Sequence, residues 1–140
     1  MSDNTVVVTK VINATREELF EAFTNPDVMN KWFYPDDDMS VEVNNTFQVG
    51  GGYTLKMHGK NGVTYTHVGE YKEIVPPEKL VFTWNSDFVQ NTVVTVTFNE
   101  LDAGTEVTIT HDLLPAGEMS ENHRGGWTGC LNRLESTMVN

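Results

Sequence analysis

Residues 115–140, PAGEMSENHRGGWTGCLNRLESTMVN, form the one long segment of the chain whose apolar residues recur at helical spacing. Apolar side chains three and four residues apart share one face of a helix, so this spacing predicts a long amphipathic helix. The predicted stripe consists of Met119, His123, Trp127, Cys130, Leu131, Leu134 and Met138. Residues 40–112 instead alternate apolar and polar side chains, which predicts antiparallel strands. A helix that follows such strands can bury its stripe in the concave face of a curved sheet, which indicates an α+β fold.

Two adjacent glycines, Gly125 and Gly126, lie in the middle of this predicted helix. Each destabilises a helix by about 0.5–1 kcal/mol relative to alanine. Their presence therefore indicates either a close approach of another backbone or a gap beside Trp127. A gap next to a buried tryptophan is a place where a small molecule can bind.

The N-terminal part of the chain predicts a strand followed by two short helices. Residues 5–12 are rich in β-branched side chains, and Thr15 with Glu18 forms a capping box for a helix over residues 15–24. Pro26 suits the first turn of a second helix, over residues 27–33. Six strands are expected between residue 39 and residue 112, around residues 41–49, 53–57, 63–74, 80–84, 92–99 and 105–112. No linker divides the chain, so we expect a single domain over residues 1–140.

Composition excludes several classes of function. The formal net charge is −11 and the chain holds only 9 Lys and Arg residues, without the basic patch that a nucleic-acid or anionic-membrane surface requires. No apolar run approaches the roughly 18–20 residues that span a bilayer, and the N-terminus lacks the pattern of a signal peptide, so we expect a cytoplasmic protein. The one cysteine, Cys130, excludes an internal disulfide and a cysteine-based zinc site. We expect no metal and no cofactor.

Aromatic residues are abundant at the positions that alternation turns inward. Any one of them can be ordinary core, but together with the glycine-interrupted helix they favour a mostly apolar pocket with a few polar groups. The residues that we place around this pocket are Trp32, Phe33, Tyr53, Met57, Tyr65, His67, Trp84, Phe88, Val96, His111, His123, Gly126, Trp127, Cys130 and Leu131.

Three histidines belong to this predicted pocket, His67 and His111 on strands and His123 on the long helix. The first interpretation is that they are neutral core residues with hydrogen-bond partners. Orientation of a ligand's polar end comes second, general acid–base catalysis third, and a zinc site last, because HxH and HExxH spacings are missing. Cys130 lies on the helical stripe and is expected to pack as a small hydrophobic residue.

Six segments carry a resemblance to a known superfamily. They are WFYPD (32–36), GGYTLKM (51–57), GEYKEIVPPEKLVFTW (69–84), VTVTF (94–98), GTEVTITH (104–111) and HRGGWTGCLNRLE (123–135). In these segments the chain resembles the START-like superfamily, which also includes polyketide cyclases and the birch-pollen allergen. Within it, the chain is similar to the branch named after the C-terminal domain of activators of heat-shock protein 90 ATPase. The resemblance implies a helix-grip fold, in which a curved seven-stranded antiparallel sheet wraps around the C-terminal helix and two short helices lie between strands 1 and 2.

The same resemblance implies an apolar cavity between sheet and helix, where members of the superfamily bind lipids, sterols, polyketides or plant hormones. Our first hypothesis is therefore the binding of a small apolar or aromatic molecule. The second is an enzyme of the same fold, a cyclase, hydrolase or dehydratase that uses His67, His111 and Tyr65. The third is a co-chaperone or another protein-interaction module. The sequence leaves open whether the chain forms a homodimer, and whether Trp84 and Trp127 themselves fill the cavity.

Overall fold

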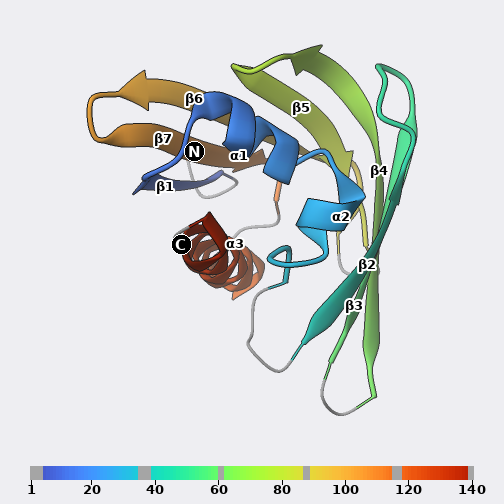
Figure 1. The fold of residues 1–140 in the computed structure, drawn as a ribbon. Helices are drawn as coiled ribbons and strands as arrows, with labels where there is room; N and C mark the ends of the chain where they lie inside the picture. The colour runs from blue at the N-terminus through green and yellow to red at the C-terminus, as the bar shows by residue number, and fades with distance from the viewer. Residues whose placement is uncertain (1–4, 35–38, 60–61, 87–88, 115–117, 139–140) are drawn as a thin grey trace.

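A single curled sheet forms the frame of the molecule, in the computed structural model that describes residues 5–34, 39–59, 62–86, 89–114 and 118–138. Its strands are β1 (Val6–Ile12), β2 (Ser40–Asn45), β3 (Gly52–His58), β4 (Thr64–Val75), β5 (Lys79–Trp84), β6 (Thr92–Leu101) and β7 (Gly104–Asp112). The strands pair antiparallel in the order β1-β7-β6-β5-β4-β3-β2. The sheet curls around the long helix α3 (Glu118–Met138), as Figure 1 shows. The predicted α+β helix-grip fold is confirmed.

Two short helices, α1 (Arg16–Ala22) and α2 (Pro26–Met29), lie between β1 and β2. The capping box predicted for α1 is present, since the backbone N–H of Glu18 donates to Thr15 Oγ1 and the N–H of Thr15 donates to Glu18 Oε1. The second helix ends at Met29, four residues before the predicted end. Trp32 and Phe33 follow it in a turn in which their rings stack at 4.7 Å, which adjacent residues of a helix cannot do.

Strand β2 is also shorter than the alternation predicted. It ends at Asn45, whose side-chain amide donates to Thr24 O and to the Tyr71 hydroxyl. A turn follows that contains Gly50 at φ +88°, and the N–H of Gly50 donates to Tyr71 O of β4. Phe47, which the alternation placed inward, is consequently exposed on this turn.

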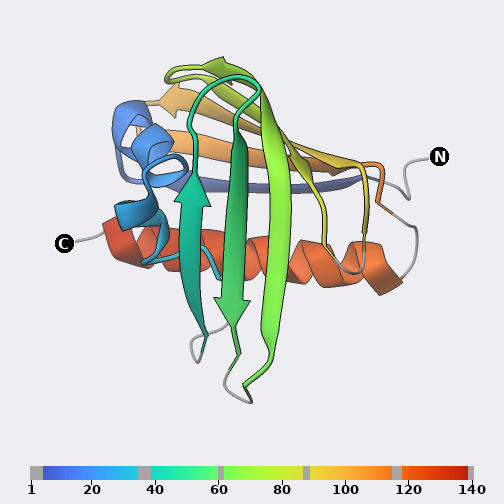
Figure 2. The same ribbon diagram turned by 90° about the vertical axis from the view of Figure 1, so that its right-hand side faces the viewer.

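Helix α3 buries one face against the concave side of the sheet. Its buried residues include Trp127, Cys130, Leu131 and Leu134, four members of the predicted stripe. Lys10 of β1 forms an ion pair with Glu135 at 3.3 Å, and Arg124 donates to Val7 O, so the helix lies beside β1. In the view turned by 90°, α3 passes behind β2, β3 and β4, and α1 and α2 lie near its C-terminal end (Figure 2).

Candidate functional site

Six rings meet between the inner face of the sheet and α3. They belong to Phe33, His67, Trp84, His111, His123 and Trp127, and we call them the ring cluster. Trp84 is 4% exposed, and its ring centroid lies 4.6 Å from that of His67 and 5.0 Å from that of Trp127. The strands β4, β5 and β7 and the helix α3 each contribute to the cluster, together with the turn after α2.

Alternation along β5 explains why Trp84 faces inward. Leu80, Phe82 and Trp84 are all buried, and Val81 and Thr83 between them are half-buried on the opposite face. On α3, Trp127 begins a buried series that continues at Cys130, Leu131 and Leu134, at helical spacing. The two tryptophans therefore meet because each lies on the buried face of its own element.

His111 is fully buried, and both of its ring nitrogens have hydrogen-bond partners. Trp127 Nε1 donates to His111 Nδ1 at 3.0 Å, so this nitrogen carries no proton. Thr92 donates its hydroxyl hydrogen to Trp84 O, so its oxygen accepts from His111 Nε2 at 2.8 Å. Burial lowers the pKa of His111 to about 3, with contributions from His123 and His67. His111 is therefore a neutral histidine that joins α3 to the sheet.

The indole of Trp84 differs from the other two indoles of the chain. Trp32 Nε1 donates to Ala22 O at 2.8 Å, and Trp127 Nε1 donates to His111 Nδ1. Trp84 Nε1 is buried and has no hydrogen-bond partner among the described residues. A buried donor without a partner costs roughly 1–3 kcal/mol.

The two glycines of α3 border open space. A Cβ atom added at Gly125 or at Gly126 would meet no atom within 4 Å. The first of the two alternatives from the sequence, a close backbone approach, is therefore wrong. Gly125 is exposed, whereas Gly126 is half-buried and directly precedes Trp127 of the ring cluster.

Tyr53 is held away from the ring cluster by a hydrogen bond across the sheet. Its hydroxyl donates to Thr83 O of β5, passing over Gly69 of β4. A Cβ at Gly69 would collide with the Tyr53 ring and with Thr83 O, so only glycine leaves room for this bond. Burial, followed by the neighbouring Tyr71, raises the pKa of Tyr53 well above its usual value.

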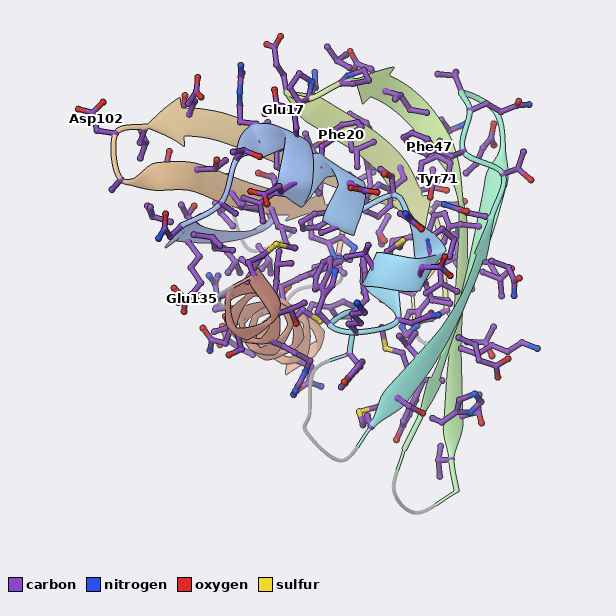
Figure 3. All side chains as sticks on the ribbon, viewed as in Figure 1. Glu17, Phe20, Phe47, Tyr71, Asp102 and Glu135 are labelled. Carbon is purple, nitrogen blue, oxygen red and sulfur yellow. The ribbon has the colours of Figure 1, made fainter. Side chains whose placement is uncertain are left out.

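A second group of aromatic residues connects α1 to the sheet. Phe20, Phe47 and Tyr71 gather at the top of the curled sheet in Figure 3, where the Phe20 and Phe47 ring centroids are 6.2 Å apart and those of Phe47 and Tyr71 are 5.2 Å apart. Trp32 packs edge-on against Phe23 at 4.7 Å and is fully buried. Phe33 touches both groups, since its ring contacts Trp32 and Trp127.

The remaining predicted pocket residues lie in different surroundings. Met57, Val96, Cys130 and Leu131 are buried. Tyr65 pairs with Met57 across β3 and β4 and therefore shares its face of the sheet, but it is 38% exposed. Phe88 lies outside the described residues.

One residue of the site was missed by sequence reasoning. Thr92 connects Trp84 O to His111, but it was not singled out as an inward residue. A signal was present, because Val94, Val96 and Phe98 are inward and two residues before Val94 the same alternation reaches Thr92. An inward threonine among buried valines predicts a side chain with a buried hydrogen-bond partner.

The described part of the chain offers neither a metal cluster nor a membrane-spanning helix. There, His, Cys, Asp and Glu side chains do not gather in groups of three or more that could hold a metal ion. Within the described ranges, no helix combines the length and apolar character that crossing a membrane requires.

Comparison with known proteins places these features in a wider context. The model of a family described as "Activator of Hsp90 ATPase homolog 1-like protein" matches residues 13–139. Protein CV1439 from Chromobacterium violaceum has a similar crystal structure, with 27% sequence identity and a TM-score of 0.87 over 95% of this chain and 96% of that one. The search of curated proteins found no match.

Two solved structures from other bacteria share the fold. The solution structure of the AHSA1-like protein from Aeromonas hydrophila is 22% identical, with a TM-score of 0.82 over 95% of this chain and 90% of that one. The crystal structure of the AHSA1 protein from Silicibacter pomeroyi is 21% identical, with a TM-score of 0.82 over 94% of this chain and 95% of that one. At these identities the similarity concerns the fold alone.

Proposed function

Since the chain belongs to the family of Activator of Hsp90 ATPase homolog 1-like proteins, we propose that it binds a small apolar or aromatic molecule between the inner face of the sheet and α3. The curled sheet and the C-terminal helix have the form of a START-like domain, and this family fits small-molecule binding. The ring cluster and the half-buried Gly126 define the place that we propose for the ligand.

One observation carries this proposal. Gly126 directly precedes Trp127 in α3 and has open space on its Cβ side, and the rings of Trp127 and His67 lie 5.0 Å and 4.6 Å from that of Trp84. Trp84 and Trp127 occupy part of the interior, since their ring centroids are 5.0 Å apart. The proposed ligand extends from these rings toward Met57 and Tyr65, on the same face of the sheet. Mostly apolar walls with a few polar groups are typical of small-molecule sites.

Catalysis by the same site has less support. A general base needs a free nitrogen within reach of its substrate, and both ring nitrogens of His111 have partners within the protein. Loss of turnover in a His67→Ala variant, with ligand affinity retained, would favour an enzyme.

The proposal predicts that a ligand of the right class raises the melting temperature. A ligand at 100 times its dissociation constant adds about 2.7 kcal/mol to the free energy of unfolding. For a domain of this size, that increment raises the melting temperature by roughly 8 °C. The measurement is thermal unfolding against a panel of aromatic ketones, flavonoids, fatty acids and sterols.

Two variants of α3 make this test specific. Gly126→Phe fills the open space beside Trp127 and should abolish the stabilisation by ligand. Gly125→Phe is the matched control, because it adds the same side chain at the exposed neighbouring position and should leave the stabilisation intact. Equal responses of the two variants, or no response of the wild type to any compound, would contradict the proposal.

A protein partner is the remaining alternative, and the family description points to it. Binding of a partner at the outer surface would not depend on whether Gly126 or Gly125 is replaced. Absence of any ligand effect, together with equal behaviour of both variants, would favour this alternative.

A further inference from the structure

The indole nitrogen of Trp84 is a buried donor whose partner the described residues do not supply. The two other tryptophans of the chain each donate to an acceptor of the protein, Ala22 O for Trp32 and His111 Nδ1 for Trp127. Buried polar groups in native proteins nearly always have partners, so an exception next to a proposed ligand site calls for an explanation.

The rings around Trp84 indicate the shape of a molecule that could supply a hydrogen-bond acceptor for its indole nitrogen. The ring planes of Phe33 and Trp84 are 16° apart, with centroids at 6.3 Å, and His67 lies over the same indole at 36°. Flat side chains of this kind present flat walls, and a planar aromatic molecule makes the largest contact with them.

The charge of the site indicates which kind of ligand atom could accept the hydrogen bond from Trp84 Nε1. A buried carboxylate needs a compensating cation, and a chain with a net charge of −11 opposes the entry of an anion. His111, whose ring centroid lies 5.9 Å from that of Trp84 and 6.0 Å from that of Trp127, is held neutral by its two hydrogen bonds. A neutral oxygen, such as a ketone carbonyl, satisfies the indole N–H without bringing a charge into the interior.

We infer that Trp84 Nε1 donates a hydrogen bond to the carbonyl oxygen of a planar aromatic ketone bound against the ring cluster. This inference rests on the proposed function and narrows it to a class of ligand. Because Trp84 Nε1 is already desolvated in the protein, the ketone gains the bond without a further cost of drying this donor.

Two matched pairs of compounds test the inference, indane with 1-indanone and fluorene with 9-fluorenone. Within each pair, the dissociation constants of hydrocarbon and ketone are compared in the wild type and in Trp84→Phe. We expect the preference for the ketone to fall about tenfold in Trp84→Phe, which corresponds to about 1.4 kcal/mol. Trp32→Phe is the control, because Trp32 lies outside the ring cluster, against Phe23, and its Nε1 already donates to Ala22 O, so its loss should leave the preference unchanged.

The indole signals of the wild-type protein provide a second measurement, which needs no folded variant at position 84. In a ¹H–¹⁵N spectrum, the ketone should shift the Trp84 indole proton downfield, the hydrocarbon should not, and the Trp32 signal should stay in place. The inference would be overturned if hydrocarbon and ketone both bind, the preference for the ketone is the same in wild type and in both variants, and the ketone causes no downfield shift. The proposed function would stand in that case, because the compounds still bind. Failure of all four compounds to bind, together with no response to the wider panel, would overturn both the inference about Trp84 and the proposed function.

Discussion

At the scale of single residues, His111 illustrates how hydrogen bonds determine the state of a buried side chain. The indole of Trp127 can only donate, so His111 Nδ1 must accept and the proton must lie on Nε2. The hydroxyl of Thr92 completes the chain, because it accepts from His111 and donates to Trp84 O. A second proton on His111 would break the bond from Trp127 and would leave a charge in the core.

This arrangement predicts a loss of stability in mild acid. The folded pKa of His111 is about 3, and the unfolded chain titrates near 6.5, so between these values the unfolded state binds a proton that the folded state excludes. The stability contributed by His111 is therefore complete above pH 6.5 and decreases as the pH falls toward 3. At pH 5 the loss is about 2 kcal/mol, from roughly 1.4 kcal/mol per pH unit. Urea unfolding at pH 7 and pH 5 measures this difference.

The variant His111→Gln serves as the control for the acid effect. It is less stable at pH 7 because glutamine cannot reproduce both hydrogen bonds, but its stability should change less between pH 7 and pH 5. An equal change in wild type and variant would assign the acid effect to other groups.

At this scale, the sequence could predict the face of the strand or helix on which a side chain lies. It could not predict which side chains form hydrogen bonds with each other. Alternation placed His67 and His111 on the inner face, and the helical stripe placed Trp127 opposite them. The pairing of Trp127 with His111, and the lack of a partner for Trp84 Nε1 among the described residues, depend on distances between elements that are far apart in sequence.

At the scale of secondary-structure elements, Thr92 at the start of β6 links this strand to β5, β7 and α3. Its hydroxyl bridges Trp84 of β5 and His111 of β7, and His111 in turn accepts from Trp127 of α3. One hydroxyl therefore helps to hold α3 against the sheet, next to the place proposed for a ligand.

Replacing this hydroxyl by a methyl group should destabilise the protein more than the small change in side-chain volume suggests. Thr92→Val has nearly the same shape but leaves His111 Nε2 without its acceptor, and we expect the free energy of unfolding to fall by about 1–3 kcal/mol. Thr95→Val is the control, because Thr95 lies on the opposite face of the same strand and should change stability by less than about 0.5 kcal/mol. Chemical denaturation of both variants makes the comparison, and equal effects would contradict a special role for Thr92.

The order of elements was predictable because each has its own local signal, such as the capping box of α1 and the alternation of β5. Two ends were predicted four residues too late, the end of α2 at Met29 and the end of β2 at Asn45. In both cases a tertiary contact determines the end. The helix α2 ends before Trp32 and Phe33, whose rings stack on each other. The strand β2 ends at Asn45, whose side-chain amide donates to Thr24 O and to the Tyr71 hydroxyl.

At the scale of the whole molecule, negative charge dominates the surface, with a formal net charge of −11. Exposed ion pairs such as Lys72 with Glu70 and Lys79 with Glu73 contribute little each. Repulsion among the excess acidic groups acts against the compact state, and dissolved salt screens it.

We therefore expect salt to stabilise the protein. Raising sodium chloride from about 10 mM to about 200 mM should increase the melting temperature by about 2–4 °C, which is roughly 1 kcal/mol for a domain of this size. Potassium chloride at equal ionic strength should act alike, since screening does not depend on the identity of the cation. A decrease in melting temperature with either salt would contradict this expectation.

The pairing of β1 with β7 has a consequence for the order in which the chain can fold during synthesis. Thr5 donates to Asp112 at 2.8 Å, although the two are 107 positions apart in the sequence. On the ribosome, β1 emerges before the other strands of the described sheet, but β7, the strand that it pairs with there, emerges after all of them. Until then, the exposed apolar side chains of the nascent β1 are a target for chaperones, and a pause in translation before β7 prolongs that state.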